Sequence, residues 1–194
     1  MKSLDRQQFL TQSAAFMLGL LCVSVAAAAW AGLSPLSKIH WSLRDFGIGV
    51  AAAGGMVVAF SFISGPWDQA EKILGRALAS CRWYDLLILS VIVGIVEELL
   101  FRGVLEPWGA RVHPVLAFLG VNLLFGMLHA VSWTYAIVAT ILGGLLSGLA
   151  HGPGEFNLLR PMVAHAVYDF IGFLWLAASY RRSQMDAHLF EKQT

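Results

Sequence analysis

The chain has 194 residues, of which 58% are hydrophobic and 13% are charged, and its formal net charge is +1. Soluble domains carry about 25% charged residues, so this composition argues against an ordinary soluble domain and indicates an integral membrane protein built as one compact bundle. The near-neutral charge, with no basic run and no acidic tail, gives no sign of a nucleic-acid partner.

Six stretches along the chain are candidate transmembrane helices, since each approaches the roughly 20 apolar residues that a bilayer requires. They are residues 9–33, 46–64, 84–105, 114–131, 133–150 and 161–180. The connection over residues 65–82 spaces its apolar residues as on one face of a short helix, which predicts an amphipathic helix on the membrane surface. The predicted fold is therefore an all-α polytopic membrane bundle with about six transmembrane helices and a short interfacial helix.

Two features of the ends of the spans predict the topology. The N-terminal apolar run is longer than the roughly 7–15 residues of a signal-peptide core, so we expect an uncleaved first span. The side that holds both tails carries eight basic residues and the opposite side carries four. The eight are Lys2, Arg6, Lys72, Arg76, Arg82, Arg181, Arg182 and Lys192, and the four are Lys38, Arg44, Arg111 and Arg160. The positive-inside rule then predicts that both termini are cytoplasmic. The shortness of the chain favours a bacterial protein, and hence the inner membrane.

Ionisable side chains inside predicted spans are costly to bury and are therefore candidates for function. Glu98 lies four residues before Arg102, which favours an internal ion pair, whereas Glu97 points about 100° away around the helix. Later spans contribute histidines and an aspartate, and a set of Glu, His and Asp can activate water or bind a metal. The full set of polar candidates is Glu97, Glu98, Arg102, Asn122, His129, His165 and Asp169.

Three motifs occur in order, each on its own predicted span: EELLFR fits EExxxR, FGMLH fits FxxxH and HAVYD fits HxxxN/D. This ordered set resembles the CPBP family of intramembrane proteases, which includes CAAX prenyl endoproteases and bacterial Abi-type proteins. The resemblance implies an intramembrane endopeptidase that hydrolyses a peptide bond of a membrane-embedded or membrane-anchored protein or peptide. The roles that it implies are water activation by Glu97 and His129, and oxyanion stabilisation or site support by His165 and Asp169; Glu98, Arg102, Asn122 and Phe125 would be supporting residues.

The resemblance also divides the chain. Residues 1–83 would hold two transmembrane helices and the amphipathic connection, residues 84–180 the catalytic bundle, and residues 181–194 a cytoplasmic tail. Members of the family have been described as metal-dependent and as glutamate-dependent, so a divalent metal such as zinc, with ligands drawn from Glu97, His129, His165 and Asp169, stays open beside metal-free chemistry. Asp169 replaces the Asn common at its position, and an aspartate donates a hydrogen bond only when it is protonated.

Other classes fit the sequence less well. HExxH is absent, the second Asp of a GxGD protease is missing, and Ser147 in GGLLSG is out of place for GxSG, so that run is interpreted as a small-residue packing motif. A non-catalytic membrane partner, such as an immunity-type protein, and a small proton or metal transporter remain alternatives. The lack of an inverted repeat disfavours the transporter.

The positions of the two histidines within their spans raise a geometric problem. If those spans were straight parallel rods, His129 and His165 would differ in depth by about 15 Å. We therefore expect that these helices either start elsewhere or tilt and break around a cavity. In the first case the last helix begins before Pro161, near Gly154 or Phe156, and the helix that carries Glu97 continues past Arg102 to about Trp108. In either case, we expect the Glu97, His129 and His165 side chains to converge within about 10 Å.

Overall fold

The computed structural model describes residues 5–62, 64–152 and 154–191, and these residues form helices and turns without any strand. The predicted all-α class is confirmed. The α-helices are α1 (Arg6–Ala31), α2 (Leu43–Ser61), α3 (Ser64–Ser80), α4 (Trp83–Leu100), α5 (Glu106–Ala110), α6 (Pro114–Leu128), α7 (Trp133–Ala150) and α8 (Leu159–Glu191). A 3-10 helix, η1 (Pro35–Lys38), precedes α2, and a π-helix, η2 (Phe101–Leu105), joins α4 to α5.

Local signals in the sequence fix several helix ends. Asp5 caps α1 by accepting a hydrogen bond from the Gln8 backbone, and Gly32 ends the same helix with φ 61°, a left-handed conformation that glycine adopts without steric cost. Ser42 and Ser132 cap α2 and α7 by accepting hydrogen bonds from backbone N–H groups in the first turn. The starts of these spans therefore follow from the chain itself.

Among the described residues, four helices are long and apolar enough to cross a membrane: α1, α2, α7 and α8 as far as Leu189. The other two predicted spans differ from these. α4 carries three acidic residues, Asp85, Glu97 and Glu98. α6 has 15 residues, so at 1.5 Å per residue it covers about 22 Å of the roughly 30 Å hydrocarbon core. The polytopic helical bundle is confirmed, with α6 as a short apolar helix within it.

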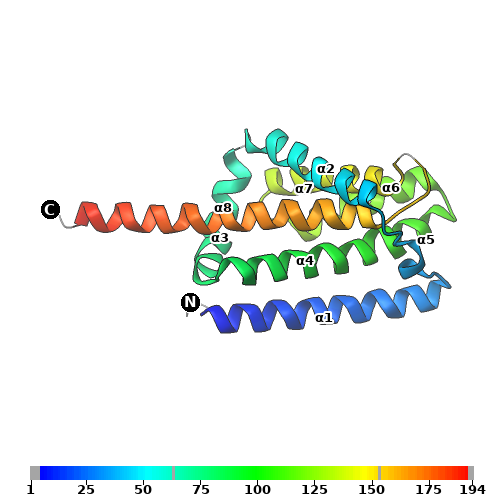
Figure 1. The fold of residues 1–194 in the computed structure, drawn as a ribbon, viewed down its shortest axis with the longest axis horizontal. Helices are drawn as coiled ribbons and strands as arrows, with labels where there is room; N and C mark the ends of the chain where they lie inside the picture. The colour runs from blue at the N-terminus through cyan, green and yellow to red at the C-terminus, as the bar shows by residue number, and fades with distance from the viewer. Residues whose placement is uncertain (1–4, 63, 153, 192–194) are drawn as a thin grey trace.

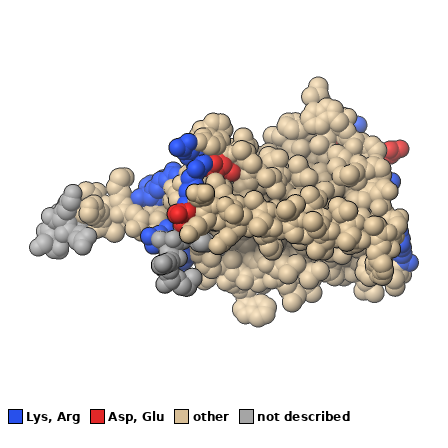
Figure 2. Space-filling model, turned by 90° about the horizontal axis from the view of Figure 1, so that it is seen from below, with Lys and Arg blue, Asp and Glu red and all other residues tan. Residues whose placement is uncertain are grey.

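Both termini lie at the same end of the bundle, and α8 runs along its length and projects beyond it (Figure 1). The predicted interfacial helix is α3, which packs on α8 at that end with Ala70 and Leu78 buried and with Lys72 and Arg76 exposed. Figure 2 shows blue Lys and Arg side chains gathered near this end, while the middle of the visible face is uncharged. This charge distribution fits a bilayer around the middle of the bundle.

Glycines allow the helices around α8 to approach closely. A methyl group on Gly94 of α4 would lie 2.8 Å from the Ala166 backbone nitrogen, and one on Gly49 of α2 would lie 2.8 Å from the Arg160 carbonyl oxygen. Real Cβ atoms do not come so close to backbone, so both positions require glycine for this packing. Gly94 stands one turn before Glu97, and it therefore brings the acidic motif of α4 against α8.

The helix that carries Glu97 continues past Arg102, as predicted. η2 and α5 keep the chain helical as far as Ala110. A π-helix adds one residue to the hydrogen-bonded turn, and such segments are frequent at functional sites. In this one the Arg102 side chain is fully buried.

The last helix begins at Leu159, two residues before Pro161. The expectation of an earlier start is right in direction, but a start near residues 154–156 is wrong. Asn157 explains the boundary, because its side-chain oxygen accepts hydrogen bonds from the backbone N–H groups of Leu159 and His40 and so fixes the entry to α8. Pro161 falls in the first turn, where a missing backbone N–H carries no penalty.

Candidate active site

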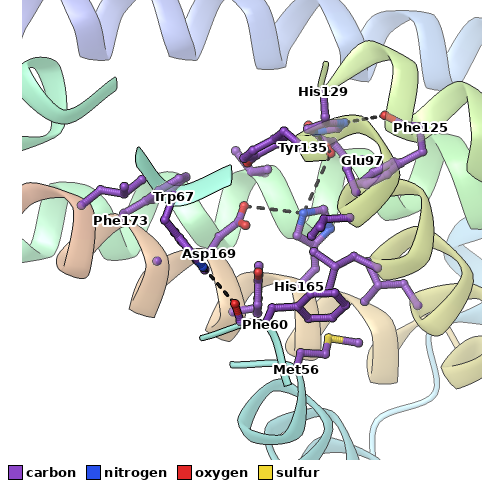
Figure 3. A pocket seen from close by; sticks show the side chains of 18 of the residues that line it. Met56, Phe60, Trp67, Glu97, Phe125, His129, Tyr135, His165, Asp169 and Phe173 are labelled. Carbon is purple, nitrogen blue, oxygen red and sulfur yellow. Dashed lines mark hydrogen bonds and ion pairs between the residues drawn. The ribbon is translucent and has the colours of Figure 1, made fainter. Parts of the chain in front are cut away.

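Three helices bring Glu97, His129 and His165 together (Figure 3). The His129 Nε2 lies 3.4 Å from the Glu97 Oε2, and the His165 Nε2 lies 3.9 Å from the same oxygen. The predicted convergence within about 10 Å is confirmed. The shortness of α6 explains it, since this helix ends at Leu128 and leaves His129 at its C-cap, inside the bundle, at the depth of Glu97 on α4.

Glu98 and Arg102 form the predicted internal ion pair. The Arg102 Nη1 donates to the Glu98 Oε1 at 2.9 Å, and both side chains are 0% exposed. The same carboxylate oxygen lies 2.8 Å from the His165 Nδ1. Because a carboxylate accepts hydrogen bonds and does not donate them, this contact fixes the His165 proton on Nδ1 and turns Nε2 towards Glu97.

Asp169 stands one helical turn after His165 on α8. Its Oδ2 lies 3.5 Å from the His165 Nε2, and its side chain is partly exposed to the cavity described below. The imidazole of His165 is therefore held by Glu98 on one nitrogen and faces Asp169 and Glu97 with the other. Asp169 lies inside the cluster, and its contact with His165 is longer than a hydrogen bond.

The residues expected to support the site contact it from α6. The Phe125 ring stacks on the His129 ring with 4.3 Å between centroids, and the Arg102 guanidinium lies 4.7 Å from the centre of the Phe125 ring. The His129 Nδ1 lies 2.7 Å from the Phe125 carbonyl oxygen, which fixes a proton on Nδ1 and turns Nε2 towards Glu97. Asn122 accepts a hydrogen bond from the Arg102 Nη2 at 3.0 Å.

A cavity of about 260 Å³ lies beside the cluster. Glu97, His129, His165 and Asp169 line one region of it and form the polar part of its wall (Figure 3). The rest of the wall is largely apolar and aromatic, and it comes from α2, α3, α7 and α8: Met56, Phe60, Trp67, Leu74, Tyr135, Val138, Leu142, Leu146, Tyr168, Phe173 and Leu176. A small polar region in a large apolar wall suits the reactive group of a mostly apolar ligand.

One carboxylate oxygen in this cavity is short of partners. The Glu97 Oε2 is buried and, among the residues that the structure describes, accepts no hydrogen bond. Buried polar atoms are nearly always hydrogen-bonded, and the exceptions concentrate at catalytic positions or at places that water occupies. Since this oxygen faces two imidazole nitrogens at 3.4 and 3.9 Å, it is placed to accept a proton or a hydrogen bond from a water molecule.

The predicted metal ligands are Glu97, His129, His165 and Asp169. Within the described part of the chain, no three His, Cys, Asp or Glu residues are arranged as a group that could hold one. Structural and catalytic zinc sites take at least three protein ligands. The residues as placed do not fit a metal, and the chemistry below is derived from side chains alone.

Two buried polar residues near the site were not among the predicted functional residues. The Ser147 hydroxyl donates to the Glu106 Oε2 at 2.6 Å, and the Arg102 Nε donates to the Ser147 Oγ at 3.3 Å. The packing interpretation of Ser147 is incomplete, because its hydroxyl belongs to the polar network. The spacing of Glu98, Arg102 and Glu106, four residues apart in turn, is the sequence signal that would have indicated Glu106.

Residues 79–171 match a family model described as "Type II CAAX prenyl endopeptidase Rce1-like". This segment, just under half of the chain, is similar to the Rce1-like family. It contains all three motifs and all four predicted catalytic residues, so the resemblance to the CAAX protease family is confirmed. The chain is also 26% identical over 193 residues to "Uncharacterized protein YpbD" of Bacillus subtilis (strain 168), covering 89% of this chain and 94% of that protein. No solved structure matches the chain significantly.

The match to the Rce1-like family model indicates the general class of the protein. Together with four helices able to span a bilayer, it makes the chain an integral membrane protein. The family supports a CAAX-type intramembrane protease in general, and hence a membrane-associated protein substrate.

Proposed function

We propose that this Rce1-like protein is a glutamate-dependent intramembrane endopeptidase in which Glu97 activates the attacking water. The observation that carries this proposal is the position of the Glu97 Oε2, which is buried at the cavity wall without a hydrogen bond from any described residue and lies 3.4 Å from the His129 Nε2. A general base must come within hydrogen-bond reach of the proton that it removes. A water molecule between Glu97 and His129 would meet that requirement.

The proposed reaction uses the three motif side chains in turn. Glu97 takes a proton from the water as its oxygen attacks the peptide carbonyl, and His129 orients the water through its Nε2. The His165 imidazolium, which carries a proton on Nε2 in addition to the one that Nδ1 donates to Glu98, donates from Nε2 to the oxyanion of the tetrahedral intermediate. Glu97 then returns its proton to the leaving amine, so the peptide C–N bond breaks and a carboxyl group and an amine are released.

The apolar walls of the cavity suggest how the substrate binds. Beyond the polar cluster, the cavity is lined by side chains such as Met56, Phe60 and Trp67. Apolar groups gain about 25 cal/mol for each Å² removed from water, so residues with large apolar side chains next to the cleaved bond would be bound best. We propose a membrane-embedded or membrane-anchored substrate with apolar residues at the cleavage site.

The experiment that tests the function is cleavage in H₂¹⁸O by the purified protein in nanodiscs, with a panel of membrane-anchored peptides analysed by mass spectrometry. We expect a product pair in which one ¹⁸O atom enters the new carboxyl group. We also expect His129→Ala to lose the products while retaining its elution volume and helicity. If the wild-type protein leaves the panel and a membrane-proteome extract intact, the non-catalytic partner becomes the better interpretation.

Asp169→Asn tests the role of the residue that departs from the common motif. Glu98 already fixes the His165 ring through Nδ1 at 2.8 Å, so orientation of His165 does not depend on Asp169. An asparagine amide can also donate to an oxyanion, and the change is worth no more than one hydrogen bond. We therefore expect the rate of peptide cleavage to stay within about tenfold of wild type. An inactive but folded Asp169→Asn variant would instead assign an orienting or metal-binding role to the carboxylate.

We further propose that both termini lie in the cytoplasm of a bacterial inner membrane. The termini share one end of the bundle (Figure 1), and on the visible face Lys and Arg side chains cluster near that end, with smaller basic areas at the opposite end (Figure 2). Because basic residues are retained on the cytoplasmic side, this end faces inwards. A green fluorescent protein fused after the C-terminus should then fluoresce, and an alkaline phosphatase fused there should be inactive. The opposite pair of results would reverse the orientation.

A further inference from the structure

A second polar cluster lies next to the catalytic cluster, beside a different cavity. Glu106 at the start of α5 and Ser147 on α7 line a cavity of about 620 Å³, whose walls also include Pro35, Phe118 and His151. Ser147 is 0% exposed and Glu106 is 6% exposed. Neither Glu106 nor Ser147 takes part in the proposed activation of water. Both are nevertheless connected to residues that do take part.

A continuous set of contacts runs from this second cavity to His165. The Ser147 hydroxyl donates to the Glu106 Oε2 at 2.6 Å, and the Arg102 Nε donates to the Ser147 Oγ at 3.3 Å. The Arg102 Nη1 then donates to the Glu98 Oε1 at 2.9 Å, and that same oxygen accepts from the His165 Nδ1 at 2.8 Å. Every link joins buried groups, so water cannot readily replace a lost partner.

Glu106 determines the direction of the hydrogen bond that Ser147 donates. A serine hydroxyl has one proton and two lone pairs. Two acceptors compete for the proton: the Glu106 Oε2 at 2.6 Å and the Asn122 Oδ1 at 3.2 Å, which already accepts from the Arg102 Nη2. The nearer, acidic acceptor wins, because hydrogen bonds to an ionised group are the stronger ones. The Ser147 lone pairs are then left to face the Arg102 Nε and the Asn122 amide.

The guanidinium of Arg102 is thereby fixed from several sides. It donates to Ser147 and Gly143 on α7, to Asn122 on α6 and to Glu98 on α4. Glu98 depends on this arrangement, because its second oxygen, Oε2, is buried and accepts no hydrogen bond from the described residues. A rotation of the guanidinium would therefore release Glu98, and with it the partner of the His165 Nδ1.

We propose that Glu106 and Ser147 are positioning residues for His165, acting through Arg102 and Glu98. They fix the guanidinium, the guanidinium fixes the Glu98 carboxylate, and the carboxylate fixes the tautomer of His165 with Nε2 towards the catalytic cavity. The positioning of the His165 ring does not depend on the proposed function. Its effect on the rate of peptide cleavage does rest on the proposed function. Glu106 and Ser147 are expected to affect turnover without contacting the substrate.

The direct test reads the ring nitrogens of His165 by NMR on ¹⁵N-histidine-labelled protein in nanodiscs. In the wild type we expect the His165 lines of a ring protonated on Nδ1, and Glu98→Leu, which removes the acceptor of that proton, provides the reference for a lost partner. Ser147→Ala and Glu106→Leu should shift or broaden both His165 lines. Ser90→Ala is the matched control, because Ser90 is also 0% exposed but its hydroxyl donates only to the Leu87 carbonyl on its own helix.

Glu106→Gln separates positioning from simple packing. Its amide oxygen can still accept the Ser147 proton, so the His165 lines should return close to their wild-type positions, whereas Glu106→Leu cannot restore them. If the His165 lines of Ser147→Ala and Glu106→Leu coincide with those of the wild type, the positioning role is overturned. A wild-type protein that cleaves no peptide would contradict the proposed function and would not change the meaning of these spectra.

Kinetics then measure the consequence for catalysis. In the cleavage assay, Ser147→Ala and Glu106→Leu should lower kcat by about 10- to 100-fold, which is the usual effect of losing a partner that orients a catalytic histidine. KM should change little, because neither residue lines the substrate cavity. Glu106→Gln should recover most of kcat. An effect confined to KM would contradict a role that acts through His165.

Discussion

Replacing Glu97 with glutamine is expected to reduce peptide cleavage by about 10²- to 10⁴-fold, the range that general bases contribute. The glutamine side chain has the same shape but cannot take a proton from water. The variant should fold, because the Glu97 Oε2 accepts no hydrogen bond from the described residues and so few contacts are lost. The measurement is the initial rate of ¹⁸O-labelled product formation from a peptide that the wild type cleaves.

The matched control for this change is Glu155→Gln. Glu155 is exposed in the turn before α8, and the same loss of charge there should leave the rate unchanged. Circular dichroism and elution volume establish that both variants are folded. A Glu97→Gln protein that keeps more than about a third of the wild-type rate would remove Glu97 from the chemistry, since even a weak general base contributes far more.

Removing Arg102 is expected to have the largest effect on stability. Arg102 and Glu98 are 0% exposed and paired at 2.9 Å, so Arg102→Met leaves a buried carboxylate without its cation. Breaking a buried pair in this way typically costs about 3–5 kcal/mol of unfolding free energy. The loss should be larger than the ion pair alone suggests, because Asn122 and Ser147 also lose a donor. Denaturant unfolding in mixed micelles measures it.

A second variant separates two contributions to the lost unfolding free energy: the missing ion-pair interaction and the cost of a buried carboxylate without a cation. In Arg102→Met combined with Glu98→Leu, no buried carboxylate is left unpaired, so part of the lost free energy should return even though the site stays inactive. Arg76→Met on the exposed face of α3 makes the same chemical change outside the network and should have little effect. If the double variant is no more stable than Arg102→Met, the ion pair is not what allows the Glu98 and Arg102 charges to be buried in the bundle.

The pairing within one helix was predictable, and the pairing between helices was not. The four-residue spacing of Glu98 and Arg102 forces their side chains onto one helix face, and the ion pair follows from that geometry alone. The partner of His165 could not be predicted from sequence spacing. Asp169, four residues later, was the natural candidate, yet Glu98 on another helix holds the closer contact, at 2.8 Å against 3.5 Å. Sequence spacing contains no information about which helices become neighbours.

The sequence by itself determined the membrane class, the helical fold and the identity of the four central polar residues, because hydrophobic length and motif order are properties of the chain alone. Tertiary structure decided how those residues meet. Gly94 permits the close approach of α4 to α8, and the early end of α6 places His129 at the depth of Glu97. It also placed Glu106 and Ser147 in the buried polar network, which they join only because three helices pack around one buried guanidinium.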